Sequence, residues 1–500
     1  MAQGADPAPA VAPAVVHGRR RLALFGLLGF SAGLPFTMFS MVLALRLQAH
    51  GVALIVIGFF AWVQLLPTLK FLWAPLLDRH DVPGFARFWG KRRGWVLLSQ
   101  LGIGASLIAM ALTAGDGNLA VTALFALLLA FWTTTLEVAS DAWRIELAPT
   151  QDSQGPIVAA NLWGYRSAMV AAGSGALLVA DAAGWAAAYL LVAVAALLPF
   201  PLLVATAPER RGAGGRTAAL VTGLVASAAI IAAVTLAAAA LGAVVLAAAA
   251  RIGIGASANV TPWVLGIAML PFIAMALALP RIRRAGPGSA IRQSAAIGPY
   301  VDFFWRYGFG AIVLMAFVSL YRMGDVLALN LSKPMIRDLG YTLSAIGRAD
   351  GLVALGASMA GVAIGGFLVM RRPLISTLAI GAIFAAIGNF GFVWLARQTP
   401  GEAMLYLATG ADQFGNGMAG AIFVVYLSML VNPRFPGAQY AFLSGWAFML
   451  PRLLSGAGGG IVETIGYDRF FLLSGTLSLA ALLFLPLLGR IRPRPSELPA

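Results

Sequence analysis

The chain has 500 residues, of which 60% are hydrophobic and only 11% are charged. Soluble domains carry about 25% charged residues, so this composition excludes an ordinary soluble protein. There is no cysteine, and there are three histidines, which argues against a disulfide framework and against a metal centre. The net charge of +15 could indicate nucleic-acid binding. However, the basic residues fall in short segments between apolar runs, which is typical of membrane orientation and not of a nucleic-acid partner.

Apolar stretches recur along almost the whole chain from Leu22 to Leu488. A hydrocarbon core about 30 Å thick needs roughly 20 apolar residues per helix. The runs lack the alternation of polar and apolar residues that membrane strands show. The sequence therefore predicts an all-α polytopic membrane protein with about 14 transmembrane helices. The predicted spans are approximately 22–45, 54–77, 95–114, 119–146, 157–181, 184–205, 217–248, 261–280, 307–331, 344–370, 373–396, 403–430, 438–462 and 470–489.

The distribution of Lys and Arg predicts the orientation of these helices. If the N-terminus is cytoplasmic, the inner loops and tails hold about four times as many Lys and Arg residues as the outer loops. We therefore expect both termini in the cytoplasm.

The order of the spans predicts two halves of six helices each. Two six-helix bundles joined by a cytoplasmic connection are the arrangement of major facilitator transporters. The two extra helices between the halves carry almost no polar side chain, so we expect them to face lipid. The expected parts are a disordered cytoplasmic tail 1–18, an N-terminal bundle 19–205, cytoplasmic linkers 206–306 that hold the extra helices 217–248 and 261–280, a C-terminal bundle 307–489 and a cytoplasmic tail 490–500.

The loop after the second predicted span contains Asp78-Arg79 and then Gly90-Lys91-Arg92-Arg93-Gly94. It is similar to the cytoplasmic signature of the major facilitator superfamily between helices 2 and 3. An aspartate at the end of one helix can pair with the arginines or with the positive N-terminus of a neighbouring helix. We expect a cytoplasmic gate formed by Asp78, Arg79, Arg92 and Arg93, with plain inside-positive anchoring as the alternative.

Charged residues inside the spans indicate a polar pathway through the membrane. Each costs roughly 2.5–3.5 kcal/mol at a helix centre, so these residues should face a wet cavity or one another. At about 1.5 Å per residue, Arg166 and Asp412 lie near the midplane, between a cytoplasmic and a periplasmic layer of charges. This layering predicts a central site, although purely structural pairing stays open for any one residue. The set comprises Lys70, Glu137, Asp141, Arg166, Arg322, Asp325, Arg348, Asp350, Asp412 and Arg452.

The order of several motifs through both halves resembles the AmpG-type anhydromuropeptide permease family. They include Gly33-Leu34-Pro35, Lys70-Phe71-Leu72-Trp73-Ala74-Pro75-Leu76-Leu77-Asp78-Arg79, Asp141-Ala142-Trp143-Arg144, Gly164-Tyr165-Arg166 and Tyr321-Arg322-Met323-Gly324-Asp325. The resemblance implies a proton-coupled importer in the bacterial inner membrane. Its cargo would be N-acetylglucosamine–anhydro-N-acetylmuramyl peptides, taken up for peptidoglycan recycling. It implies no cofactor, because the proton gradient drives transport.

The resemblance also implies which residues bind cargo or carry protons. Cargo carboxylates favour arginines as bidentate partners, and sugar faces suit aromatic walls such as Trp62, Trp163, Tyr165 and Tyr321. A buried acid beside an arginine suits the proton, which favours Asp325 or Asp141, then Glu137. Glu137 stands where relatives commonly have Asp, and Asp412 stands where some relatives have Glu. The full predicted set is Lys70, Glu137, Asp141, Arg144, Tyr165, Arg166, Tyr321, Arg322, Asp325, Asp412 and Arg452.

Three alternatives to this function stay open from the sequence. The first is a facilitator with another cargo, such as acyl-CoA, a siderophore or a drug. The second is an intramembrane transferase, which is disfavoured because the loops have no D-x-D or His-rich segment, so we do not expect an enzyme. The third is a receptor or scaffold, which would not need ion pairs throughout both halves.

Overall fold

The computed structural model describes residues 18–51, 61–113, 119–205, 273, 275–455 and 458–495. Over these ranges the secondary structure is helical, and nine helices are long and apolar enough to cross a membrane. The predicted all-α membrane fold is confirmed, whereas the predicted total of about 14 spans is not. Residues 1–17 of the predicted tail and most of the two extra helices fall outside the described residues, whereas Gly18 begins the first helix.

The N-terminal half is built from both short and long helices. They are α1 (Gly18–Thr37), the π-helix η1 (Met38–Val42), α2 (Leu43–Ala49), the 3-10 helix η2 (Ala61–Leu72), α4 (Ala74–Arg79), α5 (Phe85–Trp89), α6 (Lys91–Leu112), α7 (Leu119–Leu147), α8 (Gln151–Val170), the π-helix η3 (Ala171–Gly175), α9 (Ala176–Ala196) and α10 (Pro199–Ala205).

Two short helices, α13 and α14, lie directly before the C-terminal half. The elements are α13 (Ala290–Gln293), α14 (Gly298–Tyr307), α15 (Phe309–Asp338), α16 (Leu343–Arg348), the π-helix η4 (Ala349–Ala354), α17 (Leu355–Arg371), α18 (Leu374–Leu395), α19 (Glu402–Leu430), α20 (Pro436–Ser455), α21 (Gly458–Ile465), α22 (Tyr467–Ala480), η5 (Ala481–Phe484) and α23 (Leu485–Leu488).

The predicted second span is not one α-helix. Its described part consists of η2, which contains Pro67, followed by α4, which has Pro75 at its first turn. Proline has no N–H to donate and clashes with the preceding turn, so it disfavours a continuous α-helix. The chain continues after the break into α4, whose last two residues are Asp78 and Arg79.

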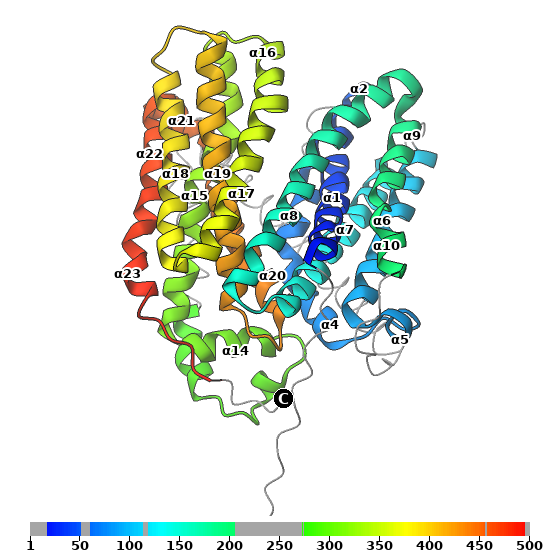
Figure 1. The fold of residues 1–500 in the computed structure, drawn as a ribbon, viewed down its shortest axis with the longest axis vertical. Coiled ribbons are helices and arrows are strands. Elements are labelled where there is room, and N and C mark those ends of the chain that lie inside the picture. The colour runs from blue at the N-terminus through cyan, green and yellow to red at the C-terminus, as the bar shows by residue number, and fades with distance from the viewer. Residues whose placement is uncertain are drawn as a thin grey trace, which may run out of the picture.

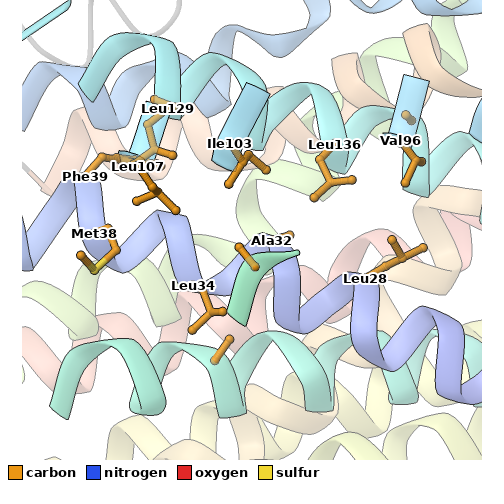
Figure 2. Packing of buried hydrophobic residues seen from close by; sticks show 14 of the residues in the cluster. Leu28, Ala32, Leu34, Met38, Phe39, Val96, Ile103, Leu107, Leu129 and Leu136 are labelled. Atoms are coloured by element: carbon orange, nitrogen blue, oxygen red, sulfur yellow. The ribbon is translucent and has the colours of Figure 1, made fainter. Parts of the chain in front are cut away.

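One buried apolar cluster lies mainly in the N-terminal half and two lie mainly in the C-terminal half. In the N-terminal half, Leu28 and Ala32 of α1 face residues of α6 and α7 such as Ile103 and Leu136 (Figure 2). Helix α1 also packs closely on α8. A Cβ added at Gly29 would collide with the backbone carbonyl of Asn161, which is the close approach that small residues permit between membrane helices.

The two bundles lie side by side and meet at one end (Figure 1). They converge at the end that carries α4, α14 and the start of α20, which the charge distribution predicts to be cytoplasmic. They diverge toward the end that carries α2 and α16, which is predicted to be periplasmic. The two ends are called the α14 end and the α16 end below.

Candidate functional site

Asp78 joins the two halves at the α14 end. Its carboxylate lies 2.9 Å from Arg92 of α6 and accepts hydrogen bonds from the backbone N–H groups of Gly437 at 3.1 Å and Ala438 at 2.7 Å. These two residues are in the first turn of α20, whose N-terminus attracts negative charge. Arg92 also pairs with Glu146 at 2.6 Å. Both kinds of contact considered from the sequence, with an arginine and with a helix N-terminus, are present.

The other two predicted gate residues have different partners. Arg79 donates to the backbone carbonyl of Gln293 in α13, at 3.4 Å. Arg93 is buried and donates to the backbone carbonyl of Leu203 in α10. Arg79 therefore contacts the linker between the halves, whereas this bond of Arg93 stays within the N-terminal half.

Arg144 connects α7 to the C-terminal half. It is 1% exposed and forms an ion pair with Asp141 at 3.0 Å. It also donates to Gln154, and to the hydroxyl of Ser428 in α19 at 2.9 Å. Its guanidinium lies 5.3 Å from the ring centre of Tyr440 in α20. A buried arginine with partners on both sides fixes the packing of the halves at this level.

A second charged group lies one turn further into the membrane along α7. Lys70 and Glu137 are 3.6 Å apart. Arg452 of α20 donates to the hydroxyl of Thr68 and interacts electrostatically with Glu137 and Tyr165. We call these residues the Glu137 cluster. It contains groups from both halves, and Glu137 pairs with Lys70 and also interacts electrostatically with Arg452.

A polar cavity of about 160 Å³ adjoins the Glu137 cluster. It brings two carboxylates and two phenol rings to one space between the halves. Ligand pockets for drug-sized molecules are typically about 300–1,000 Å³, so this cavity is large enough for only part of such a molecule. Its lining is Leu28, Ala32, Glu137, Ser140, Asp141, Asn161, Leu162, Tyr165, Val424 and Tyr440.

A third charged group lies on α15 and α19. Arg322 pairs with Asp325 at 2.7 Å and donates to the side-chain carbonyl of Asn416 at 3.3 Å. Asp325 is 4% exposed. We call these residues the Asp325 cluster. Burial of such a pair is costly unless both members keep their partners.

Arg166 connects the Asp325 cluster to the N-terminal half. It donates to the hydroxyl of Ser358 in α17 and interacts electrostatically with Asp325 and Asp412. Asp412 also accepts a hydrogen bond from Gln413 at 2.9 Å. The two residues that the sequence placed near the midplane therefore belong to one group.

Phe448 of α20 connects the two clusters. The guanidinium carbons of Arg322 and Arg452 each lie 5.6 Å from the centre of its ring. Cations within about 6 Å of an aromatic ring are attracted to its face. The two clusters therefore meet at one aromatic ring, and we call the two clusters together with Arg166 and Asp412 the polar path.

Other predicted residues lie away from this path. Tyr321 is 2% exposed, donates to the carbonyl of Leu378 at 3.3 Å and stacks on Phe423 with ring centres 5.2 Å apart. It belongs to the core of the C-terminal half. Trp163 is 42% exposed, and the side chain of Trp62 is not among those described.

Two predicted intramembrane charges pair at the α16 end instead. Arg348 pairs with Glu402, and Asp350 pairs with Lys333. Both pairs are within the C-terminal half, and their side chains are 40–51% exposed. They are not part of either cluster.

Several partners were not expected from the sequence. Thr68, Ser358 and Asn416 contact the clustered arginines. Each of these three is a polar residue within an apolar span, and this pattern could have identified them as candidates. Phe448 gave no signal, because one phenylalanine in an apolar span looks like packing.

Comparisons with known proteins agree with this fold. No protein-family model matches the chain. A protein named putative transporter AmpG 4 from Rickettsia conorii is 27% identical over 467 residues, covering 93% of this chain and 95% of that protein. The anhydromuropeptide permease of Escherichia coli K12 is 26% identical over 470 residues, covering 93% of this chain and 79% of the permease.

Solved structures with the same fold are more distant in sequence. The proton:xylose symporter XylE, bound to 6-bromo-6-deoxy-D-glucose, superposes with a TM-score of 0.62 at 14% identity, covering 95% of this chain and 96% of the symporter. The human organic anion transporter MFSD10 superposes with a TM-score of 0.58 at 15% identity, covering 94% and 99%. The resemblance predicted from the motifs is thus confirmed: the chain is a multi-pass membrane protein of the major facilitator fold and a relative of the AmpG-type anhydromuropeptide permeases.

Proposed function

We propose that the chain imports anhydromuropeptides from the periplasm to the cytoplasm together with protons, by alternating access. The observation that carries this proposal is the polar path, in which each half contributes largely enclosed charged groups, in a chain related over 93% of its length to an anhydromuropeptide permease. Buried charges are costly in a membrane and usually mark an ion or substrate pathway. Both relatives and structural neighbours are transporters or permeases, which supports transport over catalysis.

The path offers binding groups for both parts of such a cargo. Arg166, Arg322 and Arg452 can each bind a peptide carboxylate through paired N–H groups. Tyr165 and Tyr440 line the polar cavity, where their ring faces suit a sugar. The cavity volume of about 160 Å³ suits one sugar ring, so the rest of the cargo requires the halves to separate further.

The path also offers carboxylates whose charge can change during transport. Asp325 is ionised most easily while Arg322 is beside it. If cargo carboxylates draw Arg322 away, the acid is left buried without a cation, and burial favours its protonated form. The same exchange applies to Glu137 with Lys70 and Arg452. Asp325 is the stronger candidate because its carboxylate is the more enclosed of the two.

The shape of the molecule fits one stage of such a cycle. With both termini in the cytoplasm of a bacterium and the protein in its inner membrane, the α14 end is closed on the cytoplasmic side. The diverging α16 end then faces the periplasm, where the cargo is produced. No cofactor is needed, because the proton gradient supplies the free energy.

Uptake by intact cells tests this function. A strain without its own anhydromuropeptide permease would express the chain and receive labelled anhydromuropeptide, with and without a protonophore. We expect accumulation that the protonophore abolishes. No uptake by well-expressed, membrane-inserted protein would mean that the cargo is a different one.

A further inference from the structure

A second cavity lies at the α14 end, apart from the polar path. Its volume is about 690 Å³, within the range of small-molecule pockets. Its lining includes three arginines and one acid, together with three prolines and one aromatic side chain. These residues are Pro75, Asp78, Arg79, Pro287, Gly288, Arg292, Gln293, Ser294, Ala295, Pro299, Arg434 and Phe435.

The lining has an excess of positive charge. Asp78 is the one acid in it, and its carboxylate is already occupied by Arg92 and by two backbone N–H groups of α20. Arg79, Arg292 and Arg434 therefore set the charge of the wall. Guanidinium groups are the side chains best suited to bind phosphate, because they offer paired donors in one plane.

The arginines are held by surrounding structure. Arg292 is 3% exposed, with its guanidinium carbon 4.1 Å from the ring centre of Trp305. Arg434 follows Asn432, whose side chain accepts from the backbone N–H of Arg434 at 3.2 Å and donates to buried Asp302 at 2.9 Å. The guanidinium of Arg292 and the backbone of Arg434 are therefore positioned before a ligand arrives, which reduces the entropy cost of binding.

Three parts of the chain form the cavity. Pro75, Asp78 and Arg79 come from α4 of the N-terminal half, residues 287–299 come from the linker and the start of α14, and Arg434 and Phe435 precede α20. Separation of α4 from α20 would take these walls apart. A ligand that binds here would consequently favour the state in which the α14 end is closed, because it binds that state better.

We propose that this cavity binds a phosphate-bearing anion and that the bound anion holds the α14 end closed. The phosphate contacts Arg434 and Arg292, and an apolar portion of the same ligand packs on Phe435 and the prolines. Two sources share this chemistry, a soluble phosphate ester and a lipid phosphate headgroup. This proposal is independent of the cargo, so it can fail while the proposed transport function holds.

Thermal unfolding of the purified full chain tests the binding step. The probes are inorganic phosphate, compared with chloride at equal ionic strength, and phosphatidic acid in phosphatidylcholine nanodiscs, compared with phosphatidylcholine alone. We expect at least one probe to raise the melting temperature. Arg434→Gln should need about tenfold more of that probe for the same rise, since it loses a charge-assisted contact. Arg490→Gln is the matched control, because Arg490 is exposed and outside the cavity.

Cross-linking tests the second step. The chain has no cysteine, so Gln151→Cys and Arg372→Cys can be joined by a short bifunctional maleimide across the α14 end, where Gln151 contacts the carbonyl of Arg372 at 2.8 Å. The effective probe should raise the cross-linking yield several-fold, and Arg434→Gln should remove the increase.

The outcomes separate the sources and decide the proposal. A response to inorganic phosphate indicates a soluble ester, and a response to phosphatidic acid alone indicates a lipid headgroup. No response to either probe, or an equal response in Arg434→Gln and the parent chain, overturns the proposal. If Arg434→Gln does not fold, Arg292→Gln gives the same comparison, and Arg434→Lys should keep part of the response.

Discussion

The two ends of the molecule use their charged residues in opposite ways. At the α14 end, Asp78 of α4 binds the start of α20, and Arg144 reaches Ser428, so polar contacts join the halves. At the α16 end, the described pairs Arg348–Glu402 and Lys333–Asp350 each stay within one half. Hydrogen bonds that cross between the halves can form only while the α14 end is closed, whereas ion pairs within one half support one bundle in every state.

The charged residues at the α14 end are also more deeply buried than those at the α16 end. Asp78 and Arg144 are buried, but the pairs at the α16 end are 40–51% exposed. Exposed ion pairs contribute about 0–1 kcal/mol, whereas removal of one partner of a buried pair costs about 3–5 kcal/mol. We therefore expect large effects in the path and at the α14 end, and small ones at the α16 end.

Asp325→Asn should have the largest effect. It leaves Arg322 buried without its anion, at a cost of about 3–5 kcal/mol, which corresponds to a loss of about 100-fold or more in accumulation. The variant should still insert in the membrane. Asp350→Asn, which breaks a half-exposed pair, is the matched control and should keep uptake within about threefold.

Exchange separates a proton role of Asp325 from a structural one. A carrier that cannot couple to protons can still exchange labelled cargo for unlabelled cargo across vesicles. Asp325→Asn should keep exchange while it loses accumulation. Normal proton-driven accumulation by this variant would refute the role of Asp325.

Glu137→Gln should have the next largest effect. The substitution removes the negative charge of the Glu137 cluster and leaves the cations Lys70 and Arg452. We expect accumulation to fall about tenfold, because the loss of one buried partner weakens the whole cluster. Glu402→Gln is the matched control at the α16 end, measured in the same uptake assay. Equal losses in the two variants would contradict the distinction between the enclosed Glu137 cluster and the exposed pairs at the α16 end.

Asp78→Asn should open the α14 end. It removes a negative charge from the N-terminus of α20, where such charges contribute about 1 kcal/mol, or about fivefold in the closed population. The measurement is the cross-linking yield of the Gln151→Cys and Arg372→Cys pair. Asp338→Asn, whose carboxylate accepts from Tyr467 at 2.8 Å in the C-terminal half, should leave the yield unchanged. An unchanged yield in Asp78→Asn would show that Asp78 is not part of the gate.

Removal of the predicted extra helices should have the smallest effect. Leu279, near their end, is fully buried against the core of the C-terminal half, so the deletion should cover 217–272 and keep that contact. With a polar linker in place, uptake should stay within about threefold, because the predicted helical stretches that are removed carry no charged side chain. Complete loss in a protein that still folds would make the pair part of the machinery.

Much of the fold could be predicted from the sequence because apolar length and charge placement are local properties. The helical spans and the motif resemblance depend on them alone. The division of the second span into η2 and α4 could have been expected from Pro67 and Pro75. The extra helices and the domain boundaries stay predictions.

The site was harder to predict because its contacts join distant segments. The helical period puts Glu137, Asp141 and Arg144 on one face of α7. It does not show that Arg452 interacts electrostatically with Glu137 or that Arg144 donates to Ser428. Depth along the helices did place Arg166 and Asp412 together. It could not show that Arg348 and Asp350 pair away from the path, because depth does not give the direction in which a side chain points.

Proteoliposomes with an imposed pH gradient test the central proposal most directly. Purified protein would be reconstituted with a pH-sensitive dye inside, and anhydromuropeptide would be added on the acidic outside. Proton-coupled import predicts accumulation of cargo inside and acidification of the lumen that depends on the cargo. Uptake of cargo without cargo-dependent proton movement, or proton movement that is the same without cargo, would contradict it.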